Sequence, residues 1–220
     1  MELFLYMFVG FLNIIPIVYG IPNFKYFGKS LRVFYIGYLA SFLLWLLSNV
    51  LKYYSFNTHI LYYIVPVIRC TFQCLFFRYA LTNLKWANYI TSLPVIVFIY
   101  IVSNLLIFGE RKMAVDLFLI VDSLTVGLGL FFLWFQITYE NKLTINPLFW
   151  INIELIESSF LNILSNFFLG QFYEYFNNVY FNMINYGFWA IVGIINLCII
   201  VYAMVRARSK LPDLDEIPSF

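Results

Sequence analysis

Seven long apolar stretches divide this chain, and they restrict its fold more than any other feature. They run over residues 3–21, 33–51, 59–81, 89–108, 114–137, 147–170 and 179–205. An α-helix needs about 20 predominantly apolar residues to cross the hydrocarbon core of a bilayer. Composition agrees, because only 11% of the residues are charged, against about 25% in soluble domains. The pattern predicts an all-α polytopic membrane protein, a seven-transmembrane-helix bundle in contact with the lipid bilayer.

The basic residues indicate how this bundle is oriented. Lys and Arg in short loops are retained on the cytoplasmic side of a membrane. With the N-terminus outside, three basic residues face outward (Lys52, Arg111 and Lys112) and nine face the cytoplasm (Lys25, Lys29, Arg32, Arg78, Lys85, Lys142, Arg206, Arg208 and Lys210). We therefore expect residues 1–205 to form the transmembrane domain, residues 206–220 to form a cytoplasmic tail, and the protein to lie in the inner (plasma) membrane.

Several classes of function are disfavoured by what the chain carries. A net charge of +2 without a Lys/Arg run argues against nucleic-acid binding. Three cysteines without metal-ligand spacing and one histidine argue against a haem or a zinc site. No GxSxG, HExxH, CxxC or P-loop pattern occurs. We expect no cofactor, no metal and no catalytic residue of a standard hydrolase.

Four charged residues lie well inside the predicted spans, away from their ends, namely Arg69, Asp122, Glu154 and Glu157. Each costs at least about 2.5 kcal/mol to insert near the bilayer centre, so such residues normally face the bundle interior and find partners. At a rise of 1.5 Å per residue they fall at similar depths. We predict that Arg69 pairs with at least one of the acids, Asp122 or Glu157 being favoured by depth.

Polar residues also share helix faces around these charges. At 100° per residue, Glu154, Ser158 and Asn162 form one stripe with Glu157 on its flank. In the third span Arg69 and Gln73 are four residues apart, which places them on one face. These spacings predict one polar layer within the bundle, which could be a ligand site, a proton site, or a purely structural hydrogen-bonded cluster.

The two glutamates are expected to differ in role. Glu154 lies centrally on the stripe, which favours a cavity-facing group that binds a ligand or exchanges a proton. Glu157 lies on the flank, where it is better placed to pair with Arg69 and hold the bundle together. One arginine cannot neutralise three acids, so at least one acid is expected to be protonated at neutral pH.

Seven helices with an external N-terminus resemble the general plan of receptors, microbial rhodopsins and the seven-helix sensor modules of bacterial signalling proteins. The resemblance is one of topology and is carried by no motif. A retinal pigment is disfavoured, because residues 179–205 contain no lysine for a Schiff base. The acid–Arg–Tyr motif of G-protein-coupled receptors is also absent, since Arg78 and Tyr79 follow a phenylalanine.

Three functions remain open at this point. The leading hypothesis is a non-enzymatic sensor or receptor-like protein whose polar layer takes a small-molecule ligand or a proton, because the short loops leave no room for a separate domain. The second is a small proton-coupled transporter. The third is an intramembrane lipid-modifying enzyme that uses an acidic pair. The basic-to-acidic tail could dock a cytoplasmic or membrane protein partner.

Overall fold

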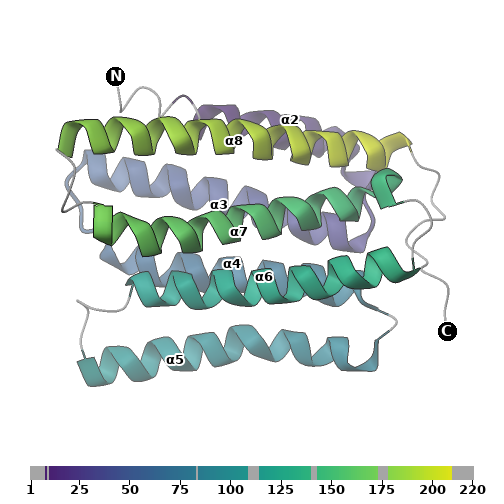
Figure 1. The fold of residues 1–220 in the computed structure, drawn as a ribbon, viewed down its shortest axis with the longest axis horizontal. Helices are drawn as coiled ribbons and strands as arrows, with labels where there is room; N and C mark the ends of the chain where they lie inside the picture. Colours follow the sequence, from purple (N-terminus) through teal and green to yellow (C-terminus); the bar gives the residue numbers. More distant parts are fainter. Residues whose placement is uncertain are drawn as a thin grey trace.

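The chain is all-α in the computed structural model, which describes residues 8, 10–82, 84–108, 114–139, 143–172 and 178–209. Within these residues it forms seven α-helices (Figure 1): α2 (Ile14–Asn23), α3 (Lys29–Tyr53), α4 (His59–Ala80), α5 (Leu93–Phe108), α6 (Ala114–Tyr139), α7 (Pro147–Phe172) and α8 (Asn178–Ser209). Three short 3₁₀ segments, Phe24–Tyr26, Lys85–Ser92 and Leu143–Ile145, lie in the connections. Each helix coincides closely with one predicted span, except that the first span lies partly outside the described residues.

The helices lie side by side, and consecutive helices run in opposite directions (Figure 1). Contacts follow the chain from α2 to α3 and from α3 to α4, continue from α4 to α6, α7 and α8, and return from α8 to α2. Six helices thus close a ring, while α5 lies outside it against α4 and α6. The outer position of α5 explains why its apolar side chains, such as Val95 and Ile99, are more than half exposed.

Four of the helical stretches in the described residues are long and apolar enough to cross a membrane, namely Lys29–Tyr53, Lys85–Ser103, Leu117–Tyr139 and Gly187–Ser209. Their apolar side chains remain exposed over wide areas, which water would disfavour and lipid would not. These four stretches are candidate transmembrane helices, and they indicate an integral membrane protein.

Two helix boundaries differ from the sequence-based expectation. The fourth span was predicted to begin at residue 89, whereas the α-helical turns begin at Leu93 after a 3₁₀ segment. Pro94 explains the shift, because proline lacks the N–H that an interior turn requires and is accommodated in the first turn of a helix.

The last helix continues to Ser209, four residues beyond the predicted end. Its final turns carry Arg206 and Arg208, and cations stabilise a helix C-terminus. The rest of the predicted tail lies outside the described residues.

Two glycines allow neighbouring helices to approach closely. A Cβ atom on Gly37 of α3 would lie 2.6 Å from Cβ of Phe72 on α4. A Cβ atom on Gly129 of α6 would lie 2.6 Å from Cγ1 of Ile156 on α7. Such contacts are shorter than van der Waals separation, so these two positions set the spacing and rotation of the α3–α4 and α6–α7 pairs.

Candidate functional site

Arg69, near the middle of α4, has an acidic partner on a neighbouring helix. Nη2 of Arg69, on α4, lies 2.9 Å from Oδ1 of Asp122, on α6. The same Nη2 donates to Oγ of Ser159, on α7, over 3.2 Å. Both carboxylate oxygens of Asp122 are buried, and Arg69 is the cation paired with them. The prediction that Arg69 pairs with one of the three acids is confirmed, and the pair links three helices.

Gln73 lies one turn further along α4 on the face of Arg69, as its spacing indicated. The hydroxyl group of Thr125, three residues after Asp122 on α6, lies 2.7 Å from Oε1 of Gln73 and donates to it. Both side chains are buried. A neutral hydrogen bond thus continues the contact between α4 and α6 beyond the ion pair.

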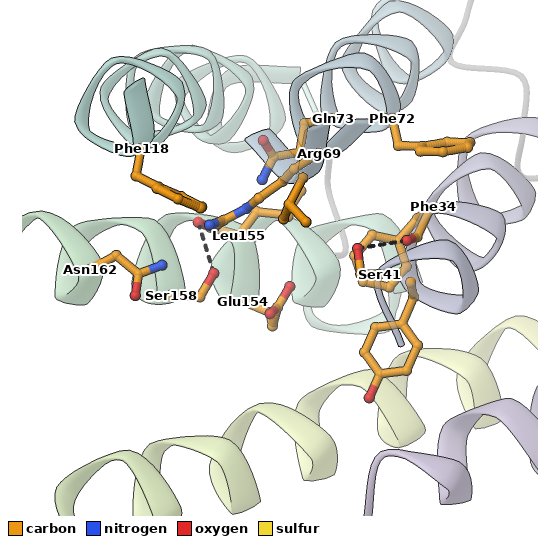
Figure 2. A pocket seen from close by; sticks show the side chains of 13 residues that line it. Phe34, Ser41, Arg69, Phe72, Gln73, Phe118, Glu154, Leu155, Ser158 and Asn162 are labelled. Atoms are coloured by element: carbon orange, nitrogen blue, oxygen red, sulfur yellow. Dashed lines mark hydrogen bonds between the residues drawn. The ribbon is translucent and has the colours of Figure 1, made fainter. Parts of the chain in front are cut away.

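A partly open cavity of about 350 Å³ adjoins the ion pair. Four helices line it: Phe34, Gly37, Tyr38 and Ser41 from α3, Val65, Arg69, Phe72 and Gln73 from α4, Phe118 from α6, and Glu154, Leu155, Ser158 and Asn162 from α7. Figure 2 shows Glu154, Ser158 and Asn162 in a row along α7, with Arg69 reaching toward α7 from α4. The polar stripe predicted on α7 therefore faces a cavity, and its volume lies at the lower end of the range for ligand pockets.

Glu154 is the unsatisfied group of this cavity. Its side chain is 9% exposed, and Oε2 has no hydrogen-bond partner. Within the described part of the chain it forms no ion pair, because the guanidinium group of Arg69 is held by Asp122. A buried acceptor without a donor costs about 1–3 kcal/mol. A proton, a water molecule or a ligand with a donor group would recover that free energy.

Glu157 does not take the role proposed for it from the sequence. The arginine pairs with Asp122, and Glu157 is half-buried and does not line the cavity. The hypothesis that Glu157 is the counter-charge of Arg69 is therefore wrong. The physical reason is rotation: Glu157 and Asp122 lie at similar depths, but the packing of α6 against α4 turns the aspartate toward the arginine.

The floor of the cavity is a cluster of aromatic rings. Phe34, in the cavity wall, lies against Phe76 with ring centroids 6.1 Å apart. Phe76 in turn packs against Phe77 and Phe132 at 5.2 and 6.3 Å. The last three side chains are fully buried. These three rings, called the aromatic floor, lie behind Phe34 near the C-terminal end of α4 and fill the space there.

A second cavity, of about 310 Å³, adjoins the first one toward the connection between α3 and α4. It shares Ser41, Val65 and Phe118 with the first cavity and extends to Lys52 at the end of α3 and Thr58 just before α4. Hydroxyl groups of Ser41 and Ser48 lie along it. The two adjoining cavities thus run from the connection between α3 and α4 to Glu154.

Several participants were not identified from the sequence. The hydroxyl of Tyr38 donates to Oδ1 of Asn13, which connects the cavity wall to the segment before α2. Ser159 is buried and accepts from Arg69, although it lies off the predicted stripe. Aromatic residues and serines occur both in cavity walls and in ordinary contacts between helices. The sequence alone therefore could not identify these residues as part of the site.

Two further buried amides lie away from the cavity. Gln136 of α6 is fully buried, and neither its oxygen nor its nitrogen has a hydrogen-bond partner. Asn152 of α7 donates from Nδ2 to the carbonyl of Gly129 over 3.0 Å. The hydrogen bond of Asn152 joins α7 to α6, and neither amide residue lines either cavity.

The described residues include no group of three or more histidine, cysteine, aspartate or glutamate side chains placed to hold a metal ion. What the site offers chemically is one carboxyl group, one paired guanidinium group, amide and hydroxyl groups, and aromatic walls. Comparisons of the chain with protein-family models, with curated proteins and with solved structures found no match.

Proposed function

We propose that this protein is a sensor or receptor-like membrane protein that binds a small molecule in the cavity between α3, α4, α6 and α7. The observation that carries the proposal is Glu154, a buried carboxyl group without a partner that faces a partly open cavity. A polar group left unpaired at membrane depth is costly, and it normally marks a functional site.

In this proposal all seven helices cross the inner (plasma) membrane, with the N-terminus outside and the C-terminus in the cytoplasm. The support is the excess of basic residues, nine against three, on one side. In that orientation the second cavity, which reaches Lys52 and Thr58, opens toward the outside. The aromatic floor of Phe76, Phe77 and Phe132 then lies between the site and the cytoplasm.

The same geometry favours a sensor over the alternative of a proton-coupled transporter. A carrier must expose its site alternately to both sides, and here the route on one side is filled by fully buried rings. The transporter remains the second candidate, because a buried acid at the end of a polar route also suits proton coupling. Uptake into proteoliposomes under a pH gradient would favour the transporter.

The test uses the purified protein in lipid nanodiscs and a library of small metabolites, with the melting temperature as readout. Ser158→Trp fills the cavity, because Ser158 lines it. Ile99→Trp is the matched control, since Ile99 lies on the outer helix α5 and is 56% exposed. Compounds that stabilise the wild type and the control but not Ser158→Trp support the proposal. If every stabilising compound acts equally on Ser158→Trp, the cavity is not the binding site.

A further inference from the structure

The charges around the cavity are not balanced, and this imbalance restricts the class of ligand. Arg69 and Asp122 form an ion pair at 2.9 Å and together contribute no net charge. Glu154 is left as the single ionisable group of the lining without an opposite charge. Glu157, one turn away on α7, can add only negative potential. An ionised Glu154 therefore makes the cavity attractive for a cation and repulsive for an anion.

The remaining wall is suited to the same class. Four aromatic side chains, Phe34, Tyr38, Phe72 and Phe118, line the cavity on α3, α4 and α6. Figure 2 shows Phe118 close to the row of polar groups on α7, while Phe34 and Phe72 lie on the side of α3. Aromatic faces attract ammonium groups, most strongly where water is excluded. Inorganic divalent cations prefer several charged oxygen ligands instead, and the lining holds a single carboxyl group beside neutral amide and hydroxyl groups.

We propose that the cavity binds a small monovalent organic amine, whose ammonium group donates to the carboxylate of Glu154 while its apolar part lies against the aromatic rings. This inference rests on the proposed function, because it names the ligand class of the same cavity. Gln73, Ser158 and Asn162 supply further polar contacts. The amine restores both the missing hydrogen bond and the missing charge.

Lys52, at the far end of the second cavity, does not oppose this assignment strongly. It lies eleven residues beyond Ser41 on α3, or roughly 16 Å along the helix at 1.5 Å per residue. Lys52 is exposed at that end of the helix, where solvent stabilises its charge. The Coulomb energy falls with separation, so its repulsion of an ammonium group is much weaker than the attraction by a contacting carboxylate.

The experiment compares three probes of similar size on the full chain in nanodiscs at pH 7. These are 2-phenylethylamine, 2-phenylethanol and 3-phenylpropanoate, which are cationic, neutral and anionic. The amine is expected to bind at least about tenfold more tightly than the other two, because a hydrogen bond to a charged group is worth more than one between neutral groups. Titration calorimetry and the rise in melting temperature give the dissociation constants.

Variants then test the residues. Glu154→Gln keeps the shape of the side chain but removes its charge, so the amine should bind about 10- to 100-fold more weakly. Glu157→Gln is the matched control and should stay within about threefold, because Glu157 does not line the cavity. Phe118→Leu removes one ring, and we expect a loss of about two- to tenfold. It also provides a readout if Glu154→Gln does not fold.

The results separate this inference from the proposed function. If the alcohol or the carboxylate binds as tightly as the amine, or if Glu154→Gln retains the affinity of the wild type, the amine assignment is wrong. If the alcohol or the carboxylate binds to the wild type but not to Ser158→Trp, the cavity is still a ligand site, but for another class of ligand. If no probe binds up to millimolar concentration, the amine proposal is overturned. The metabolite screen then decides whether the cavity binds any small molecule.

Discussion

Arg69 and Asp122 form an ion pair whose two members depend on it to different extents. The side chain of Asp122 is 1% exposed, so its carboxylate is almost completely removed from solvent. The side chain of Arg69 is 22% exposed and also donates to Ser159. The change Arg69→Leu therefore leaves a fully buried acid without a counter-charge, whereas Asp122→Leu leaves a partly exposed arginine that keeps its hydrogen bond to Ser159.

The expected magnitudes follow from this difference. Removing one member of a buried pair costs about 3–5 kcal/mol, and partial exposure of Arg69 to the cavity places Arg69→Leu near the lower limit, at about 3 kcal/mol. For Asp122→Leu we expect about 1–2 kcal/mol, since the arginine retains its hydrogen bond to Ser159. The double variant should be more stable than Arg69→Leu alone, because it leaves no buried charge.

The assay is the melting temperature of the purified protein in nanodiscs. At about 2–4 °C per kcal/mol for a chain of this size, Arg69→Leu should melt roughly 6–12 °C below the wild type. Arg78→Leu is a suitable control on the same helix, because its guanidinium group makes a long, exposed hydrogen bond of 3.4 Å with Asn88 and lies over the ring of its neighbour Tyr79, without an ion pair to a buried acid. The reasoning is refuted if Asp122→Leu melts below Arg69→Leu, or if the loss in the double variant equals the sum of the two single losses.

Three further predictions concern packing, the second glutamate and orientation. Gly129→Ala should lower the free energy of unfolding by about 1–3 kcal/mol, because the added Cβ meets α7 at 2.6 Å. Gly127→Ala, whose Cβ has nothing within 4 Å, should raise the free energy of unfolding by up to about 1 kcal/mol. Chemical denaturation measures both. Glu157→Gln and Glu154→Gln should both melt within about 2 °C of the wild type, since neither residue holds the arginine, and a much lower value for Glu157→Gln would restore its structural role. A reporter fused after Phe220 should be active in the cytoplasm, and activity on the outer side would reverse the orientation.

The helices and the position of the polar layer were accessible from the sequence because both depend on distance along a single helix. The length of an apolar run decides whether a helix can cross a bilayer, and the predicted spans agree with the observed helices to within a few residues apart from the first. The four-residue spacing of Glu154, Ser158 and Asn162 likewise requires only the period of one helix. All three indeed line the cavity.

The partner of Arg69 and the existence of the cavity were decided by tertiary structure alone. Asp122 and Glu157 lie at comparable depths, so the sequence could not choose between them. The choice depends on how α6 and α7 are rotated, and the close contact between Gly129 and Ile156 restricts that rotation. The same close contacts determine which aromatic side chains fill the floor and which leave space around Glu154, because packing between helices depends on shape in three dimensions and not on the order of apolar residues.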